Sequence, residues 1–410
     1  MIRDHMFSPL ANRTYRHLMA AQLLSLLGSG LATVALGLLA YELAGADAGA
    51  VLGTALAIKM IAYVGLAPVA SAFVHLVPRR SLLVGLDCMR AAVALLMPFV
   101  TEVWQIYLLI FVLQAGSAAF SPTFQATIPD ILPNEAEYTK ALSLSRLAYD
   151  LESLTSPALA AALLGLMGFH WLFAANALGF LASAALVLTV LLPTPKPPDT
   201  QEGAWQRITR GVRLYLATAE LRALLSLNVA VAAAGAMVIV NTVVLVRTSF
   251  GLGATELGWT LAAYGGGSML AALLLPRLLD RVMTDRTAML AGAALLVIGL
   301  LLGPVVPNWP LLLPLWVLLG LGNGLVMTPS GRLLRRAAEA GDRPALFAAQ
   351  FALSHACWLL AYPLAGRLGA AAGLDVAFLV LAGLGVVGLG AAVALWRPPT
   401  SPGTPGAASP

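Results

Sequence analysis

Six charged residues lie within apolar segments of the chain, where a charge is costly and therefore points to function. They are Lys59, Asp87, Arg90, Arg146, Asp150 and Glu152. An ionised side chain at the centre of a bilayer costs about 2.5 kcal/mol or more, so residues of this kind are candidate functional sites. Three of the six are bases and three are acids, so the set as a whole can be neutral. Such groups either pair with one another or take up and release protons.

Asp150 is the candidate proton carrier of this set. It stands four residues after Arg146, so the two side chains share one face of a helix and can pair. Lys59 has no acid at helical spacing and needs a carboxylate from another helix, for which Asp150 and Glu152 are the choices. A carboxylate that passes between an arginine and a lysine changes its proton affinity as it changes partner. The alternative is that these pairs brace the helices and never change protonation.

Asp87 and Arg90 form a second pair within one apolar segment. They stand three residues apart and can bond across one helix face. We interpret this pair as a structural brace, with a role in proton coupling as the alternative.

Uncharged polar residues within the apolar segments are candidate contacts for a ligand in a central cavity. They are Gln22, Ser25, Ser29, Gln114, Asn228, Asn241 and Asn323. The alternative is that they form hydrogen bonds between helices, as most such residues do in a helical bundle.

His355 is a further cavity candidate, although a lone histidine is more often a satisfied core residue. Cys357 follows it by two positions, about 200° around a helix, so we do not expect the two to share a metal. Only one other cysteine, Cys88, is present, and the sequence predicts no disulfide framework, no metal site and no cofactor. No Walker loop occurs, so we expect no ATPase activity.

The composition indicates whether water or lipid surrounds the helices that carry these residues. The chain has 410 residues, of which 60% are hydrophobic and 10% are charged. A soluble domain has roughly 25% charged residues, so we expect lipid to cover this chain. The net charge of +5 does not predict nucleic acid as a partner, because the basic residues lie at helix ends without interleaved aromatic residues.

A membrane-spanning helix needs about 20 largely apolar residues. Segments of this kind predict an all-α integral membrane protein with twelve transmembrane helices, at 18–43, 50–74, 82–100, 105–127, 140–168, 171–193, 222–248, 256–279, 287–306, 310–332, 345–367 and 376–396.

Basic residues in alternate loops predict the orientation, because they favour the cytoplasmic side. Arg79, Arg207, Arg335 and other basic residues all fall in the loops on the side of the N-terminus. We expect a multi-pass protein of the cell inner (plasma) membrane with both termini in the cytoplasm. No removable signal peptide is expected at the N-terminus.

The longest polar interruption divides the chain into two bundles of six helices. The predicted organisation is a cytoplasmic N-terminus (1–17), an N-terminal bundle (18–193), a cytoplasmic linker (194–221), a C-terminal bundle (222–396) and a disordered tail (397–410). In the linker, apolar residues from Trp205 to Tyr215 recur at helical spacing with arginines between them. This pattern predicts a helix in the headgroup region, with a solvated linker as the alternative.

The two halves match at an offset of about 205 residues, which indicates a parallel internal repeat. The matched features include Gly116 with Gly322 and Ser121-Pro122 with Thr328-Pro329. Two glycine runs, 265–267 and 320–324, predict close helix packing where the two bundles move against each other.

With this repeat, the chain resembles the major facilitator superfamily (MFS) of transporters over nearly its whole length. In that family the loop between helices 2 and 3 reads Gly-x-x-x-Asp-Arg-x-Gly-Arg-Arg. The aligned stretch here, 71–80, keeps the final Arg pair and has His75 in place of the usual acid. The resemblance assigns a cytoplasmic gate to His75, Arg79, Arg80, Asp280, Arg281 and Arg286.

The segments 87–90, 125–133 and 141–145 are similar to the efflux branch that contains macrolide and enterobactin exporters. This resemblance implies a monomeric, proton-coupled exporter of a small amphipathic or drug-like molecule, and not an enzyme. Nickel-resistance exporters are also similar, so efflux of a divalent metal cation such as nickel or cobalt is the alternative. A membrane enzyme or sensor would need a catalytic cluster or a soluble domain, and the sequence contains neither.

Overall fold

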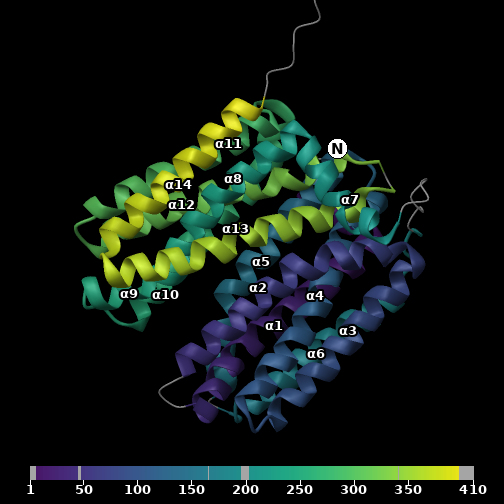
Figure 1. Ribbon diagram of the computed structural model, residues 1–410, viewed down its shortest axis with the longest axis horizontal. Coiled ribbons are helices and arrows are strands. Elements are labelled where there is room, and N and C mark those ends of the chain that lie inside the picture. The colour runs from purple at the N-terminus through teal and green to yellow at the C-terminus, as the bar shows by residue number, and fades with distance from the viewer. Residues whose placement is uncertain (1–5, 45–47, 165, 195–202, 340, 397–410) are drawn as a thin grey trace, which may run out of the picture.

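The computed structural model describes residues 6–44, 48–164, 166–194, 203–339 and 341–396. These residues form helices joined by turns, and no strand occurs among them. Two bundles of long helices lie side by side, one from each half of the chain (Figure 1). The prediction of an all-α protein with two helical bundles is confirmed.

Within the described residues, six helices form the N-terminal bundle. Their bounds are α1 (Arg13–Ala44), α2 (Ala48–Phe73), α3 (Arg79–Leu96), α4 (Val103–Ile131), α5 (Glu135–Leu164) and α6 (His170–Leu188). Short 3-10 turns flank them at Ser8–Ala11, Val74–Leu76 and Met97–Phe99.

The described part of the C-terminal bundle also contains six spans. Its helices are α8 (Ala219–Ala236), α9 (Thr242–Val244), α10 (Ala254–Arg281), α11 (Asp285–Leu302), α12 (Trp309–Ala337), α13 (Arg343–Ala371) and α14 (Leu374–Leu395), with a 3-10 turn at Gly303–Val305. α8 and α9 belong to one span, because π-helical turns at Met237–Asn241 and Leu245–Ser249 continue it.

Eleven spans among the described residues are long and apolar enough to cross a membrane. The span that fails this criterion is α5, although it lies within the N-terminal bundle (Figure 1). The reason is its content of charged residues, which are Glu135, Glu137, Lys140, Arg146, Asp150 and Glu152. A helix that keeps so many charges within a bundle faces protein or a polar cavity with them.

The two bundles share one packing pattern. α1 packs on α6 and α2 on α4, as α8 packs on α14 and α10 on α12. Gly116 of α4 contacts Met89 and Arg90 of α3, and Gly322 of α12 contacts Gly292 of α11. The same helix pair is therefore joined at the same glycine position in each half. Between the bundles, α2 contacts α13 and α5 contacts α10.

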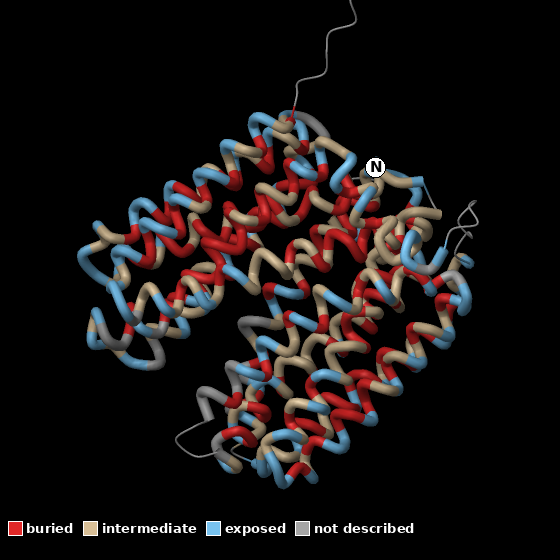
Figure 2. The backbone as a smooth tube through the Cα atoms, in the orientation of Figure 1, coloured by how far each residue is buried: buried red, intermediate tan, exposed pale blue. Residues whose placement is uncertain are grey.

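The two bundles converge where the N-terminus and the linker helix lie, and diverge toward the opposite side (Figure 1). We call these two ends of the molecule the linker side and the far side. Buried residues follow the interior of each bundle, and exposed residues cover the outer faces (Figure 2). Large apolar side chains such as Leu178, Leu360 and Val387 are exposed there. Lipid would cover such a surface.

The linker contains one helix, α7 (Ala204–Ala217), which contacts both α2 and α13. Tyr215 is fully buried against the C-terminal bundle, whereas Trp205 is exposed. Arg210 Nε lies 2.6 Å from Asp342 Oδ1 and joins α7 to the start of α13. The apolar face of α7 is thus partly covered by protein, and its placement in the headgroup region stays a prediction.

The glycine runs lie between helices of one bundle, and not at the interface between the bundles as expected. A Cβ on Gly320 of α12 would lie 1.9 Å from Tyr264 O of α10, and one on Gly267 would lie 2.1 Å from Val317 O. These glycines let the backbones of α10 and α12 approach closely, because neither has a side chain at the contact.

Gly320→Ala is expected to destabilise the protein, because its methyl group would collide with a backbone carbonyl. Forcing an extra carbon into a packed contact costs about 1–3 kcal/mol. Thermal unfolding of the purified protein measures the loss as a lower Tm. Gly390→Ala in α14 is the matched control, because a Cβ there would meet no atom within 4 Å. Equal Tm values for the two variants would contradict this packing.

Candidate functional site

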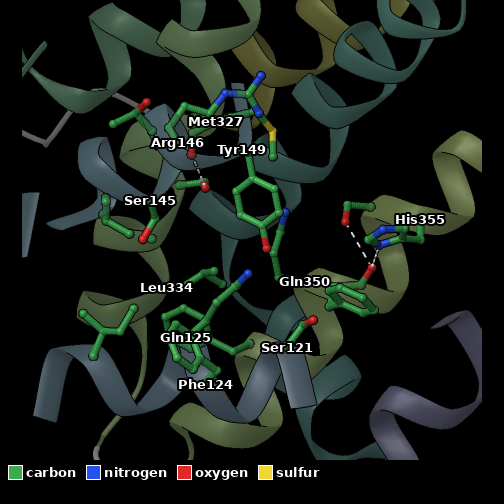
Figure 3. Close-up of a pocket in the computed structure, with 18 of the residues that line it drawn as sticks. Ser121, Phe124, Gln125, Ser145, Arg146, Tyr149, Met327, Leu334, Gln350 and His355 are labelled. Carbon is green, nitrogen blue, oxygen red and sulfur yellow. Dashed lines mark hydrogen bonds between the residues drawn. The ribbon is translucent and has the colours of Figure 1, made fainter. Parts of the chain in front are cut away.

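A cavity of about 460 Å³ lies between the two bundles. α1, α2, α4 and α5 line it from one side, and α12 and α13 line it from the other. Its aromatic and apolar residues include Phe124, Met327, Phe347, Phe351 and Trp358. The side chains of Gln125, Tyr149 and Gln350 converge near its middle (Figure 3). The arrangement suits a ligand with an apolar body and a few polar groups.

The linker helix reaches this cavity through Tyr215. Its hydroxyl lies 2.5 Å from Gln350 Oε1, and Gln350 lines the cavity. Burial raises the pKa of Tyr215 well above its usual range, so the hydroxyl is a hydrogen-bond donor. This bond fixes the Gln350 amide with its NH2 group available to a ligand.

Arg146 joins the two bundles at the wall of the cavity. Arg146 Nη2 lies 2.9 Å from Asp150 Oδ1, one turn further along α5. Arg146 Nε donates a hydrogen bond to Ser268 Oγ of α10 at 2.8 Å. Asp150 is buried. A relative movement of the bundles would break the Arg146–Ser268 bond and change the surroundings of the Asp150 carboxylate.

Lys59 of α2 lines the cavity beside Tyr63. Its Nζ lies 5.6 Å from the centre of the Tyr63 ring, and the Tyr63 and His355 rings are perpendicular with their centres 4.8 Å apart. His355 Nδ1 lies 2.7 Å from Phe351 O. Lys59, Tyr63 and His355 thus form a second place where polar groups of both bundles meet.

Glu152 interacts with Lys59 only at longer range. Its Oε1 and the Ser156 hydroxyl both lie 2.2 Å from the point where a Cβ on Gly30 of α1 would stand. Glu152 therefore faces α1, and it is not among the described residues that line the cavity. No carboxylate oxygen of the described residues lies within 4 Å of Lys59 Nζ.

Asp87 and Arg90 lie within the N-terminal bundle. Arg90 Nη2 bonds to Asp87 Oδ1, and Ser183 of α6 donates to Asp87 Oδ2 at 2.7 Å. The Arg90 guanidinium packs over Phe120 at 4.1 Å and Phe180 at 4.4 Å. The pair links α3 to α4 and α6, and the rings supply additional cation–π attraction.

Ion pairs lie on the linker side of the cavity, next to its lining residues Ile128, Gly331 and Phe347. Asp130 at the end of α4 binds two arginines, Arg79 of α3 at 2.6 Å and Arg343 at the start of α13. Tyr138 of α5 donates to Gly331 O of α12 at 3.2 Å. The Asp130–Arg343 and Tyr138–Gly331 contacts join the two bundles, whereas the Arg79–Asp130 pair lies within the N-terminal bundle.

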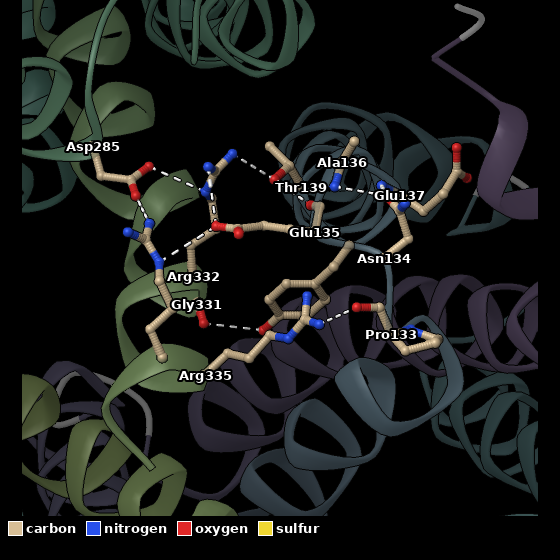
Figure 4. Close-up of polar contacts among 12 residues, drawn as sticks. Pro133, Asn134, Glu135, Ala136, Glu137, Thr139, Asp285, Gly331, Arg332 and Arg335 are labelled. Atoms are coloured by element: carbon tan, nitrogen blue, oxygen red, sulfur yellow. Dashed lines mark hydrogen bonds and ion pairs between the residues drawn. The ribbon is translucent and has the colours of Figure 1, made fainter. Parts of the chain in front are cut away.

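A second cluster lies where α5 begins and α12 ends (Figure 4). Arg332 lies 3.1 Å from Glu135 Oε1 and 3.2 Å from Asp285 Oδ1, and it donates to Thr139 Oγ1 at 2.7 Å. Arg336 also binds both Glu135 and Asp285. We define the linker-side gate as two sets of contacts. One set joins Asp130 to Arg79 and Arg343, and the other joins Arg332 and Arg336 to Glu135, Thr139 and Asp285.

A family model described as transmembrane secretion effector matches residues 5–332 of the chain. This span covers well over half of the sequence. The chain belongs to this MFS family. It is therefore a transporter and not an enzyme, as the sequence predicts, and the resemblance to the MFS is confirmed.

Two relatives agree with this assignment. An uncharacterised MFS-type transporter of Bacillus subtilis, YfiS, is 25% identical over 329 residues, which is 77% of each chain. Macrolide efflux protein A of Enterococcus faecalis is 25% identical over 152 residues. That match spans 35% of this chain and 47% of the relative.

Solved structures show the same fold. The crystal structure of the human organic anion transporter MFSD10 superposes with a TM-score of 0.80 at 13% identity. A bacterial homologue of the iron transporter ferroportin, in an outward-facing state, superposes with a TM-score of 0.78 at 14% identity. Each match covers 93% of this chain and 99% of the other.

The structure brings part of the predicted cavity set together. Gln22 and His355 line the main cavity of the transporter, and Ser29 and Gln114 line a smaller chamber beside it. The remaining predicted residues, Ser25, Asn228, Asn241 and Asn323, line neither space. Two of these amides are satisfied by their own bundle, since Asn228 donates to Leu224 O and Asn241 to Ala365 O.

Of the six residues predicted to form a cytoplasmic gate, Arg79 and Arg80 make contacts on the linker side. Arg79 binds Asp130, and Arg80 donates to Leu188 O. Arg286 has no ion pair among the described residues, whereas its neighbour Asp285 holds both Arg332 and Arg336. The side chains of His75, Asp280 and Arg281 lie outside the described residues.

Sequence reasoning missed most of the gate because several of its ion pairs join helices of different bundles. Asp130, Glu135, Arg332, Arg336 and Arg343 stand at helix ends, where charges are normally solvated. One signal was available: the acids end α4 and begin α5, and the arginines occupy the equivalent ends of α12 and α13. When equivalent helix ends in the two halves carry opposite charges, the internal repeat predicts that they meet across the axis that relates the halves.

Proposed function

We propose that this transporter is a proton-coupled exporter that moves a small amphipathic molecule by alternating access. The observation that carries the proposal is the cavity between the bundles, closed on the linker side by ion pairs that join them. Rocking of the bundles would break the linker-side gate and open the cavity to the linker side.

The linker side is the cytoplasmic side in this proposal. Arginines gather there, as the positive-inside rule requires, in α7 and at the ends of α12 and α13. The closed gate then makes this an outward-facing state in a cell inner membrane, with both termini cytoplasmic. Because one chain supplies both halves of the cavity, a monomer is sufficient for transport.

Asp150 supports proton coupling. It is a buried carboxylate whose partner, Arg146, also bonds to the opposite bundle. When the bundles rock, Arg146 loses Ser268 and its hold on Asp150 changes, which changes the proton affinity of that acid. Uptake and release of a proton would then follow the conformational cycle.

A metal cation is the less supported substrate. No group of three or more His, Cys, Asp or Glu side chains able to hold a metal occurs among the described residues. The likeness to the ferroportin homologue concerns the fold alone. The partial match to macrolide efflux protein A instead favours efflux of an organic molecule.

Export from cells that express the transporter tests the proposal. A panel of drug-like compounds and divalent metals, each with and without a protonophore, is compared between expressing and empty cells. We expect at least one amphipathic compound to accumulate less in expressing cells, and the protonophore to remove the difference. Protonophore-insensitive export, or export of a metal alone, would contradict the proposal.

A further inference from the structure

The charges that line the main cavity are unbalanced. Lys59 and Arg146 are its cationic side chains, and no carboxylate is among its described lining residues. Arg146 is neutralised by Asp150 at 2.9 Å. Lys59 has no carboxylate of the described residues within 4 Å, and its long-range partner Glu152 faces α1. A lysine held in this setting is a binding point for an anion.

A smaller chamber of about 130 Å³ lies beside the main cavity, and Lys59 and Tyr63 line both. Its other polar residues are Ser29, Thr33, Gln114, Ser117 and Asn176. Asn176 is almost completely buried, and its Oδ1 lies against α1, 3.0 Å from the point where a Cβ on Gly28 would stand. Tyr63 donates to Gln114 Oε1 at 2.9 Å, and a chamber lined by such polar groups suits the polar part of a ligand.

We infer that the substrate is an amphipathic organic anion. Its charged group binds Lys59 at the junction of the two spaces, and its polar end occupies the smaller chamber. Its apolar body lies in the main cavity against Phe124, Phe351 and Trp358. This inference rests on the proposed function, and it names the substrate class of that same cavity.

Binding of matched fluorescent probes to the purified transporter in lipid nanodiscs tests the inference. The probes are dansylated undecanoic acid, its neutral methyl ester and the dansyl amine of equal length, with empty nanodiscs as the blank. We expect the acid to bind about tenfold or more tightly than the ester, because a charge-assisted bond is lost in the ester. Lys59→Gln removes this preference, and Lys59→Arg keeps it.

Arg222→Gln is the matched control, because Arg222 is an exposed residue at the start of α8 outside the cavity. It removes one positive charge and leaves the preference unchanged. Equal binding of acid and ester, no saturable binding of the acid, or an unchanged preference in Lys59→Gln would overturn the inference.

A transport assay separates this inference from the proposed function. Proteoliposomes with an imposed proton gradient are loaded with each probe. If the acid binds in a Lys59-dependent way but the gradient does not move it, the anion site stands and proton coupling fails. If the gradient moves the amine and not the acid, the exporter stands and the anion inference is overturned.

Discussion

Asp150→Asn is expected to lower proton-driven, uphill export by about tenfold or more while substrate exchange continues. Asparagine keeps the size of aspartate and can accept a hydrogen bond from Arg146. Its amide does not ionise, so it cannot take up and release a proton. The cavity and the linker-side gate do not include Asp150, so substrate binding and rocking should persist. Uphill export and counterflow exchange, measured on the same proteoliposomes, give the two rates.

Two further variants make this result specific. Asp375→Asn, at an exposed aspartate in the first turn of α14, should leave both rates unchanged. Asp150→Glu, which keeps the carboxylate, should recover part of the uphill rate. If Asp150→Asn loses exchange and thermal stability together, the Arg146–Asp150 pair is a brace. Full uphill export would show that the coupling acid lies elsewhere.

Arg332→Ala is expected to open the linker side. The substitution removes the contacts of Arg332 with Glu135, Thr139 and Asp285, and it leaves the buried Asp285 with Arg336 alone. The loss of the Glu135 ion pair and the Thr139 hydrogen bond, which cross between the bundles, costs about 2 kcal/mol, roughly thirtyfold in the ratio of the two states. The closed population should therefore fall.

Spin-label distances measure this change, in a background where Cys88 and Cys357 are replaced by serine. Cysteines for the labels are introduced at exposed positions in pairs. Leu76 and Val282 report on the linker side, and Leu166 and Val305 report on the far side. In Arg332→Ala the first distance should lengthen and the second shorten. Arg222→Ala is the control, and identical distance distributions in both variants would contradict the gate.

The twelve spans could be predicted from the sequence because each apolar segment is long and separated by a polar turn. For α5, the order of the apolar segments along the chain predicted a span where hydropathy alone does not. Its charges keep it outside the criterion that the eleven other spans of the described residues meet, yet it follows α4, precedes α6 and lies within the N-terminal bundle. The pairs within one helix, Arg146–Asp150 and Asp87–Arg90, also followed from spacing, since neighbours at i+3 and i+4 share a face.

Contacts between helices could not be predicted in this way. Nothing in the spacing of Lys59 indicates that Glu152 faces Gly30, and the choice of partner depends on helix rotation. For the same reason Asn228 and Asn323 were placed in the cavity, although both lie elsewhere. The linker-side gate depends on how the two bundles meet, which a local pattern does not encode.

Proton movement in proteoliposomes that contain only the purified transporter tests the central claim most directly. A pH-sensitive dye is enclosed, and a transported compound from the cell panel is added on one side without any ion gradient. Proton-coupled exchange predicts that protons move opposite to the substrate and change the internal pH. This change should be absent in empty liposomes and in Asp150→Asn. Substrate flux without a pH change would contradict proton coupling and leave a transporter driven by the gradient of its own substrate.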